Sequence, residues 1–372
     1  DLDGVVTFDA AVPAFEGALT LARPAANGVD AALPWRLTSR LKATPAAAAF
    51  EQIEAAYGPE DSALRFTGAG DIRFGASPLL RMALAARQLD ADRLLGAGGA
   101  VPLMPALRRM VAALPAAPLP AQIEIGAEQV ALGGRSLQTI AIELRGDPSI
   151  WHVAKFELRA PGGTRISASG TVAAARFTGP LTLEAADPEL LAAWLQGRSD
   201  AAYRGQKPLR LRGTATIAPD ALALDGLSAD IDGGAVEGRL ALLTPDGGAA
   251  RFEAALAAPR FDLDAATTLI GTLAGPRADW PAEAQISLQA GSATIAGQEM
   301  RPAAVRFAYG PAALTLERLQ LGDAATGVAL SGSGAFDRSE NSGRLTLTAA
   351  APALAQIGAL LAPVAPAVAE RI

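Results

Sequence analysis

The stretch from Leu209 to Leu243 alternates apolar and polar side chains with a period of two residues. That period is typical of a β-strand with one apolar and one solvated face, because successive side chains point to opposite faces. Turn signals at Pro219-Asp220 and Asp232-Gly233-Gly234 divide the stretch, which predicts a short antiparallel meander. Its aliphatic set is Leu209, Leu211, Ile217, Leu222, Leu224, Ile231, Val236, Leu240 and Leu242.

Strand patterns of this kind cover most of the chain. They are densest from Gln122 and again from Gln285. The aliphatic residues that extend the candidate set into these two blocks are Ile123, Ile125, Ile286 and Leu288.

Five short helical patterns interrupt the strands. Thr44 and Pro45 are typical of a helix start, so the alanine-rich residues 44–57 are predicted to be helical. Residues 102–120 form an amphipathic pattern, and shorter patterns begin near Asp187, Phe261 and Pro352. The chain is therefore predicted to be mainly β, built of antiparallel meanders with short capping helices.

The two halves of the sequence resemble each other. Gln122-Ile123 matches Gln285-Ile286 at an offset of 163 residues (285 − 122), and Leu84-Ala85-Ala86 matches Leu256-Ala257-Ala258 at 172 (256 − 84). Self-similarity of this kind is typical of an array of stacked units. We predict four segments in the order A1 (1–120), B1 (121–200), A2 (201–280) and B2 (281–372).

A long meander with one apolar face must shield that face from water, since about 25 cal/mol is at stake per Å² of apolar area. The sheet can fold on itself and fill its interior, or it can form a trough that holds an apolar guest. Only 5% of the residues are aromatic, so the inward positions are mostly small and aliphatic. An aliphatic guest would suit such a lining, and both solutions remain open.

The strand pattern of Leu222 to Leu242 resembles that of the AsmA family of bacterial envelope proteins. The same is true of two helix openers that alternate apolar residues with aspartates, Leu89 to Leu95 and Phe261 to Leu269. The resemblance implies an elongated, twisted, taco-like β-groove in the periplasm, which shields phospholipid acyl chains in transit to the outer membrane and contributes to outer-membrane assembly. It also implies an inner-membrane anchor. Because the chain begins at Asp1 rather than Met, we expect that anchor upstream.

Other function classes receive little support. The chain has no Cys, a single His and a net charge of −6 with mixed signs, so we expect no cofactor or metal and no nucleic-acid partner. Asp147, Ser149 and His152 are the residue types of a catalytic triad, but they lie too close together in sequence. An exposed turn is the better interpretation of His152, and we expect no enzyme.

Two further carboxylate patterns favour structural roles. The pairs Asp90/Asp92 and Asp262/Asp264 precede helical patterns and are predicted to be N-caps. The stretch Asp230 to Gly234 lacks the spacing of a calcium loop and is predicted to be a turn.

Membrane contact has limited support in the sequence. The amphipathic helix at 103–114 can either cover the end of the sheet or lie on a membrane surface. No stretch is long and apolar enough to cross a bilayer as a helix, and Ala353 to Ala369 comes nearest. The alternative to a lipid-handling module is a structural envelope protein that has a filled β core and acts through protein partners.

Overall fold

The computed structural model describes residues 1–8, 12–24, 33–94, 103–112, 114, 116–195, 208–231, 234–244, 250–262, 281–295, 298–325 and 327–352. The chain divides into two compact units, unit 1 (1–205) and unit 2 (206–372). Both consist mainly of β-strands, which confirms the predicted fold class at that level. The division into four segments stays a prediction.

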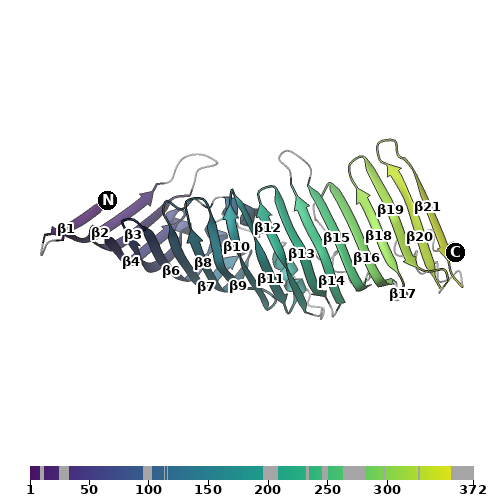
Figure 1. Cartoon of the computed structure of the whole chain (residues 1–372), viewed down its shortest axis with the longest axis horizontal. Coiled ribbons are helices and arrows are strands. Elements are labelled where there is room, and N and C mark those ends of the chain that lie inside the picture. The colour runs from purple at the N-terminus through teal and green to yellow at the C-terminus, as the bar shows by residue number, and fades with distance from the viewer. Residues whose placement is uncertain are drawn as a thin grey trace. The chain divides into compact units, whose positions relative to one another are not determined.

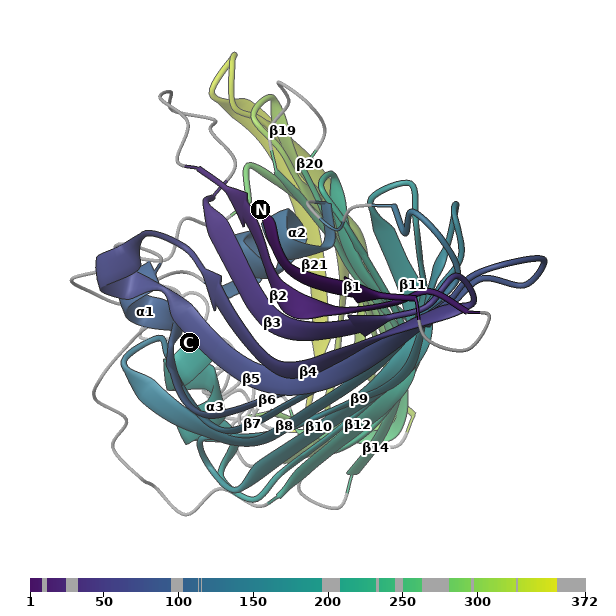
Figure 2. The same cartoon turned by 90° about the vertical axis from the view of Figure 1, so that its left-hand side faces the viewer.

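The described residues of unit 1 form a sheet of eleven strands, and each strand pairs with its neighbours in the sequence (Figure 1). Several of its strands bend strongly along their length (Figure 2). The described residues of the unit also form a 3₁₀ turn at Glu60–Ser62 and three helices, α1 (Ala91–Leu94), α2 (Leu103–Ala112) and α3 (Pro188–Leu195). The strands are β1 (Leu2–Thr7), β2 (Ala14–Arg23), β3 (Trp35–Ala43), β4 (Ala47–Tyr57), β5 (Leu64–Arg73), β6 (Leu79–Asp90), β7 (Ala121–Leu132), β8 (Arg135–Gly146), β9 (Trp151–Ala160), β10 (Thr164–Ala173) and β11 (Arg176–Ala185).

The described residues of unit 2 form ten strands, which also follow one another along the sheet (Figure 1). The short β17 pairs with the end of β16, and β18 pairs with the rest of it. The strands are β12 (Leu209–Ala218), β13 (Ala221–Ile231), β14 (Gly234–Leu243), β15 (Arg251–Asp262), β16 (Glu283–Ile295), β17 (Gln298–Met300), β18 (Ala303–Tyr309), β19 (Ala313–Gly322), β20 (Ala329–Asp337) and β21 (Ser342–Ala350).

Two of the described strand pairs are parallel, in a chain that the sequence predicted to consist of antiparallel meanders. They are β6 with β7 in unit 1 and β15 with β16 in unit 2. Every other described pair is antiparallel. A parallel pair needs a crossover connection, and residues 91–120, with α1 and α2, provide it in unit 1. The alternation of apolar and polar residues indicates which side chains share a face of the sheet, but not whether two neighbouring strands are parallel or antiparallel. The sequence pattern therefore could not predict these two parallel pairs.

The predicted helix at 44–57 is wrong, because Ala47–Tyr57 forms strand β4. This strand pairs with both β3 and β5, and a bulge separates Phe50 from Ile53. Gln52, in the bulge, has a positive φ of 52°. The extra residue of the bulge shifts the apolar positions of β4 by one. Its apolar residues therefore do not alternate with a period of two, and the alanine-rich segment was predicted to be a helix.

The helical patterns predicted at 102–120 and near Asp187 are confirmed as α2, which is shorter than predicted, and α3. The short helix α1 lies within the helix opener Leu89 to Leu95. The carboxylate of Asp187 caps α3 by accepting the backbone N–H groups of Glu189 and Leu190, at 3.1 Å each. Asp90 caps α1 through the N–H of Arg93, at 2.9 Å. The helices expected after Phe261 and from Pro352 lie outside the described residues, as do Asp232 and Asp264.

Asp92 has a different role from the predicted cap. Its two carboxylate oxygens accept the backbone N–H groups of Gly133 and Gly134, at 2.6 and 2.8 Å. The indole N–H of Trp194 in α3 donates to the carbonyl of Leu132, at 2.8 Å. Side chains of α1 and α3 therefore both bind the β7–β8 turn.

Candidate functional site

The aliphatic set of the meander lies on one face of unit 2. The register places Leu209 opposite Ile231 and Ile217 opposite Leu222, and residues directly opposite each other in an antiparallel pair share a face. Across the next pair, the opposed residues are Leu222 with Leu242, Leu224 with Leu240, and Ala229 with Val236. Leu211 lies opposite Ala229 and so belongs to the same face.

A bulge in β13 keeps this face apolar. The register shifts between Leu224 and Leu227, so residues 225 and 226 together occupy the place of one. Gly226 has a φ of +58°, a left-handed conformation that glycine adopts at low cost. Without the extra residue, Leu227 and Ala229 would point to the polar face.

The apolar face continues through the remaining strands of unit 2, across the parallel pair. Ile286 lies opposite Ala254 and Phe307, and Leu288 lies opposite Leu256 and Val305. The residues predicted from the sequence included Ile286 and Leu288 but not their neighbours on the adjacent strands, although those neighbours follow the same alternation of apolar and polar side chains. We define the apolar face of unit 2 by the aliphatic set of the meander and by Ile286 and Leu288, together with further residues of the same face. These are Leu227, Ala229, Phe252, Ala254, Leu256, Ala258, Ala290, Ala303, Val305, Phe307, Leu314, Leu316, Leu319, Leu321, Leu330, Phe336, Leu345 and Leu347.

Burial varies across this face. A row of mostly small side chains is buried, namely Ala229, Val236, Ala258, Ala290, Ala303, Leu321 and Leu330. Leu288 is buried as well, whereas most of the predicted set is half-buried. Towards β21 the face opens, where Leu345 is 59% and Leu347 46% exposed. The described part of unit 2 consists of strands and their connections, so no described helix covers these leucines.

Ile123 and Ile125 belong to the corresponding apolar face of unit 1. Ile123 lies between Met82 and Leu144, and Ile125 has Leu84 and Ile142 as its neighbours on the adjacent strands. The amphipathic helix α2 contacts β11. Among the described residues, no helix combines the length and hydropathy that a bilayer-spanning segment needs.

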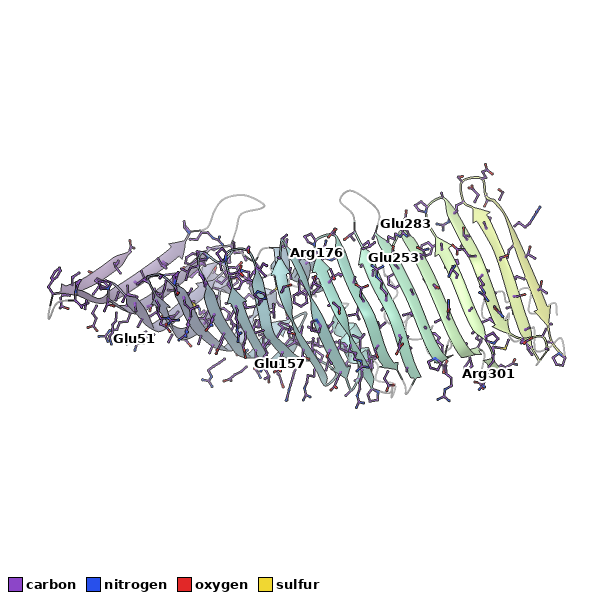
Figure 3. All side chains as sticks on the ribbon, viewed as in Figure 1. Glu51, Glu157, Arg176, Glu253, Glu283 and Arg301 are labelled. Carbon is purple, nitrogen blue, oxygen red and sulfur yellow. The ribbon has the colours of Figure 1, made fainter. Side chains whose placement is uncertain are left out.

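The opposite face of unit 2 is polar. Arg239 pairs with Asp225 at 2.8 Å and with Glu253 at 3.7 Å, while Arg251 pairs with Glu253 at 3.1 Å. Figure 3 labels Glu253 on this unit, and Glu51 and Glu157 on unit 1. A shallow hollow of about 340 Å³ lies here, lined by Arg239, Glu253 and six further residues. The side chains of these ion pairs are partly exposed to solvent, so the pairs contribute little to stability. Since this face carries charged groups that contact water, we interpret it as the water-facing side.

Two of the three triad candidates, Asp147 and Ser149, form a turn. The Asp147 carboxylate accepts the N–H groups of Ser149 (2.9 Å) and Ile150 (2.8 Å) and the Ser149 hydroxyl (3.1 Å). These bonds, the Ser149 N–H first, hold the pKa of Asp147 below its usual range. His152 is exposed as predicted, but it lies in strand β9 rather than in a turn. Within the described ranges, no group of three or more His, Asp or Glu side chains is arranged to hold a metal ion.

Comparison with protein-family models, curated proteins and solved structures finds no match for this chain. The resemblance to the AsmA family therefore rests on the strand pattern and the helix openers alone.

Proposed function

We propose that the chain is a non-enzymatic lipid-handling module whose apolar face shields acyl chains from water. The observation that carries the proposal is the exposure of leucines at the open part of the apolar face of unit 2. A contiguous apolar surface in water is costly, and such surfaces usually mark a binding site. A structural protein with a filled core would bury them.

The dimensions of the face suit an acyl chain. Four rows of side chains, spaced by two residues along each strand, span about 20 Å. One leaflet of a bilayer core is about 15 Å thick, so an extended chain can lie along a strand within this width. Nine strands about 4.8 Å apart extend the face by about 38 Å across the strands, which leaves room for several chains side by side.

Solvation supplies the energy for such binding. Each buried CH₂ group contributes about 0.8 kcal/mol, so a chain in contact along one side gains several kcal/mol. No covalent chemistry is required. Together with the resemblance, this favours passage of phospholipids between the inner and outer membranes of a Gram-negative envelope, with the periplasm as the compartment and envelope proteins as partners.

The experiment that tests the proposal is mass spectrometry of lipids extracted from the purified, detergent-free protein, followed by incubation with labelled phospholipid. We expect close to stoichiometric phospholipid. A protein that stays lipid-free after incubation would refute the proposal and favour the filled-core alternative. The double variant L222D/L240D should lose the lipid while its far-UV spectrum remains that of a β-protein, because both carboxylates would enter the apolar face.

A further inference from the structure

The apolar face of unit 2 is closed at one end of its strands and open at the other. The row of residues at the closed end is buried and consists of Ala258, Ala290, Ala303, Leu321 and Leu330. The row at the open end includes Leu222, Leu242, Phe252, Leu314 and Phe336, whose side chains are half-buried or exposed. An acyl chain that lies along a strand therefore has different surroundings at its two ends.

Phe261 of β15 belongs to the closed end, although the alternation of the strand would not place it there. Continued from Ala258, the alternation would bring Arg260 and Asp262 to the apolar face. Both of these residues are exposed, whereas Phe261 is half-buried and packs against the buried residues of the face. The parity of β15 therefore changes at Pro259.

Two buried clusters of the apolar face share Phe261 as a packing partner. The first cluster comprises Leu227, Ala229, Val236 and Ala258. The second comprises Ala290, Ala293, Met300, Ala303, Leu321 and Leu330. Half of these residues are alanines, which form a low surface, and the large side chain of Phe261 packs against both clusters. Phe261 thereby covers the closed end of the face.

The backbone of the parallel pair fixes the position of Phe261. A Cβ added to Gly291 would lie 2.7 Å from the carbonyl oxygen of Pro259, so β15 and β16 approach more closely here than a side chain allows. Beyond this point the register continues, with Phe261 opposite Ala293, and Ala293 pairs on its other side with Met300. Ala293 and Met300 are only 1% and 3% exposed, so the neighbours of Phe261 in the sheet are buried.

Unit 1 shows the same change of parity in its own parallel pair. Ala86 lies opposite Ala127, and after the change Leu89 lies opposite Val130. Leu89 and Val130 are each 7% exposed. Phe261 and Leu89 both come three residues after the last alanine of the regular alternation, so a large apolar residue closes the strand end in each unit.

We propose that Phe261 limits the length of acyl chain that the apolar face of unit 2 accepts, because its side chain stops the terminal methyl group at the closed end. This inference rests on the proposed function. The row that contains Ala258 is already buried, which leaves the three rows from Leu256 to Phe252, and these span about 13 Å along the strand. One leaflet of a bilayer core is about 15 Å thick, so the last groups of an ordinary membrane acyl chain find no free apolar surface here.

The affinity for lipids should therefore depend on chain length in two regimes. Until the chain reaches Phe261, each added CH₂ group enters the apolar face and tightens binding by up to about fourfold. Beyond that length, further CH₂ groups are not buried and leave the affinity unchanged. For lysophosphatidylcholines with a single acyl chain, we expect the affinity to rise from decanoyl to myristoyl and to level off at palmitoyl and stearoyl.

The test is a calorimetric titration of the detergent-free chain with this lipid series, at lipid concentrations below micelle formation. In the F261A variant the levelling-off should move to longer chains, so that stearoyl binds about threefold or more tightly than palmitoyl. The matched control is F252A, which makes the same substitution in the same strand at the open end. F252A should weaken binding of all chain lengths by the same factor and leave the levelling-off where it is.

A second variant does not remove a packed side chain. F261W enlarges the residue at the closed end and should move the levelling-off to shorter chains, and far-UV spectra establish that each variant is folded. Affinity that keeps rising through stearoyl in the original chain would overturn the inference. So would F261A and F261W variants that level off at the same chain length as the original chain. These results leave the proposed function standing, whereas a failure to bind any member of the series would refute the proposed function and the inference with it.

Discussion

The two exposed leucines of β21 allow a direct test of whether the apolar face of unit 2 binds lipid. Leu345 and Leu347 project on the apolar side, and Thr346 and Thr348 project on the polar side of the same strand. Replacing both leucines by Asp places two carboxylates where we propose that acyl chains lie. We expect the L345D/L347D variant to lose most of its lipid affinity at this end of unit 2.

The magnitude follows from the exposed fractions. Full burial of a leucine side chain is worth about 1.5–3 kcal/mol. Scaling by exposures of 59% and 46%, contact with a lipid can contribute about 1.6–3.2 kcal/mol for the pair. Loss of that contact alone weakens binding by about 15- to 200-fold, and desolvation of the carboxylates adds to it.

Binding is measured by titrating the detergent-free protein with a fluorescent phospholipid. The matched control is T346D/T348D, which adds the same charges to the same strand on the other face, and L345M/L347M keeps the apolar surface. Both controls should bind like the original chain. If T346D/T348D weakens binding as much as L345D/L347D, the effect arises from charge or strand stability, and our assignment of the apolar face is wrong.

Three further predictions concern the fold. Asp92→Asn leaves only one amide oxygen for the two turn N–H groups, so we expect a loss of about 2 kcal/mol in urea unfolding, and an unchanged midpoint would exclude the clamp. Gly226→Ala should cost about 1 kcal/mol for conformational reasons alone, because nothing lies within 4 Å of the added methyl group; a stabilised variant would contradict the bulge. Hydrogen bonds to the carboxylates of Asp337 (the Ser339 hydroxyl first) and Asp147 (the Ser149 N–H first) lower the pKa of both. The ionised carboxylates of Asp147 and Asp337 therefore stabilise the fold at pH values above about 3.8, the ordinary pKa of Asp. This stabilisation is lost as the pH falls through the lower pKa of the folded state. The D147N and D337N variants should accordingly be less stable than the original chain at neutral pH but not in strong acid, as measured by urea unfolding.

The strands were predictable where their alternation is unbroken. The described residues between Leu209 and Leu243 form the strands β12, β13 and β14 that their pattern predicted, and the bulge after Leu224 interrupts the alternation without ending the strand. β4 was not predictable in the same way. Its alanines have high helix propensity, and the bulge at Gln52 removes the period of two. Pairing with β3 and β5 and the burial of Ile53 outweigh that local preference.

The extent of the candidate site was only partly predictable. The aliphatic set of the meander could be found because its turns mark where each strand begins. The apolar residues of β18 to β21 have the same alternation, yet the order of strands decides whether they join the same surface. That order depends on the parallel pairs, whose contacts link residues far apart in sequence.

The two parallel pairs indicate what fixes the register of these sheets. In unit 1, Leu84 lies opposite Ile125, and in unit 2, Leu256 lies opposite Leu288. The connections, residues 91–120 and 263–282, differ in length, yet each pairing aligns apolar with apolar residues. A slip of one residue would place Gln289 among the leucines, so the apolar face, rather than the connection, selects the register. A filled core and a lipid-binding trough both require a register that keeps the apolar residues on one face. They differ in the exposure of the outermost leucines, which is why Leu345 and Leu347 are the residues to change first.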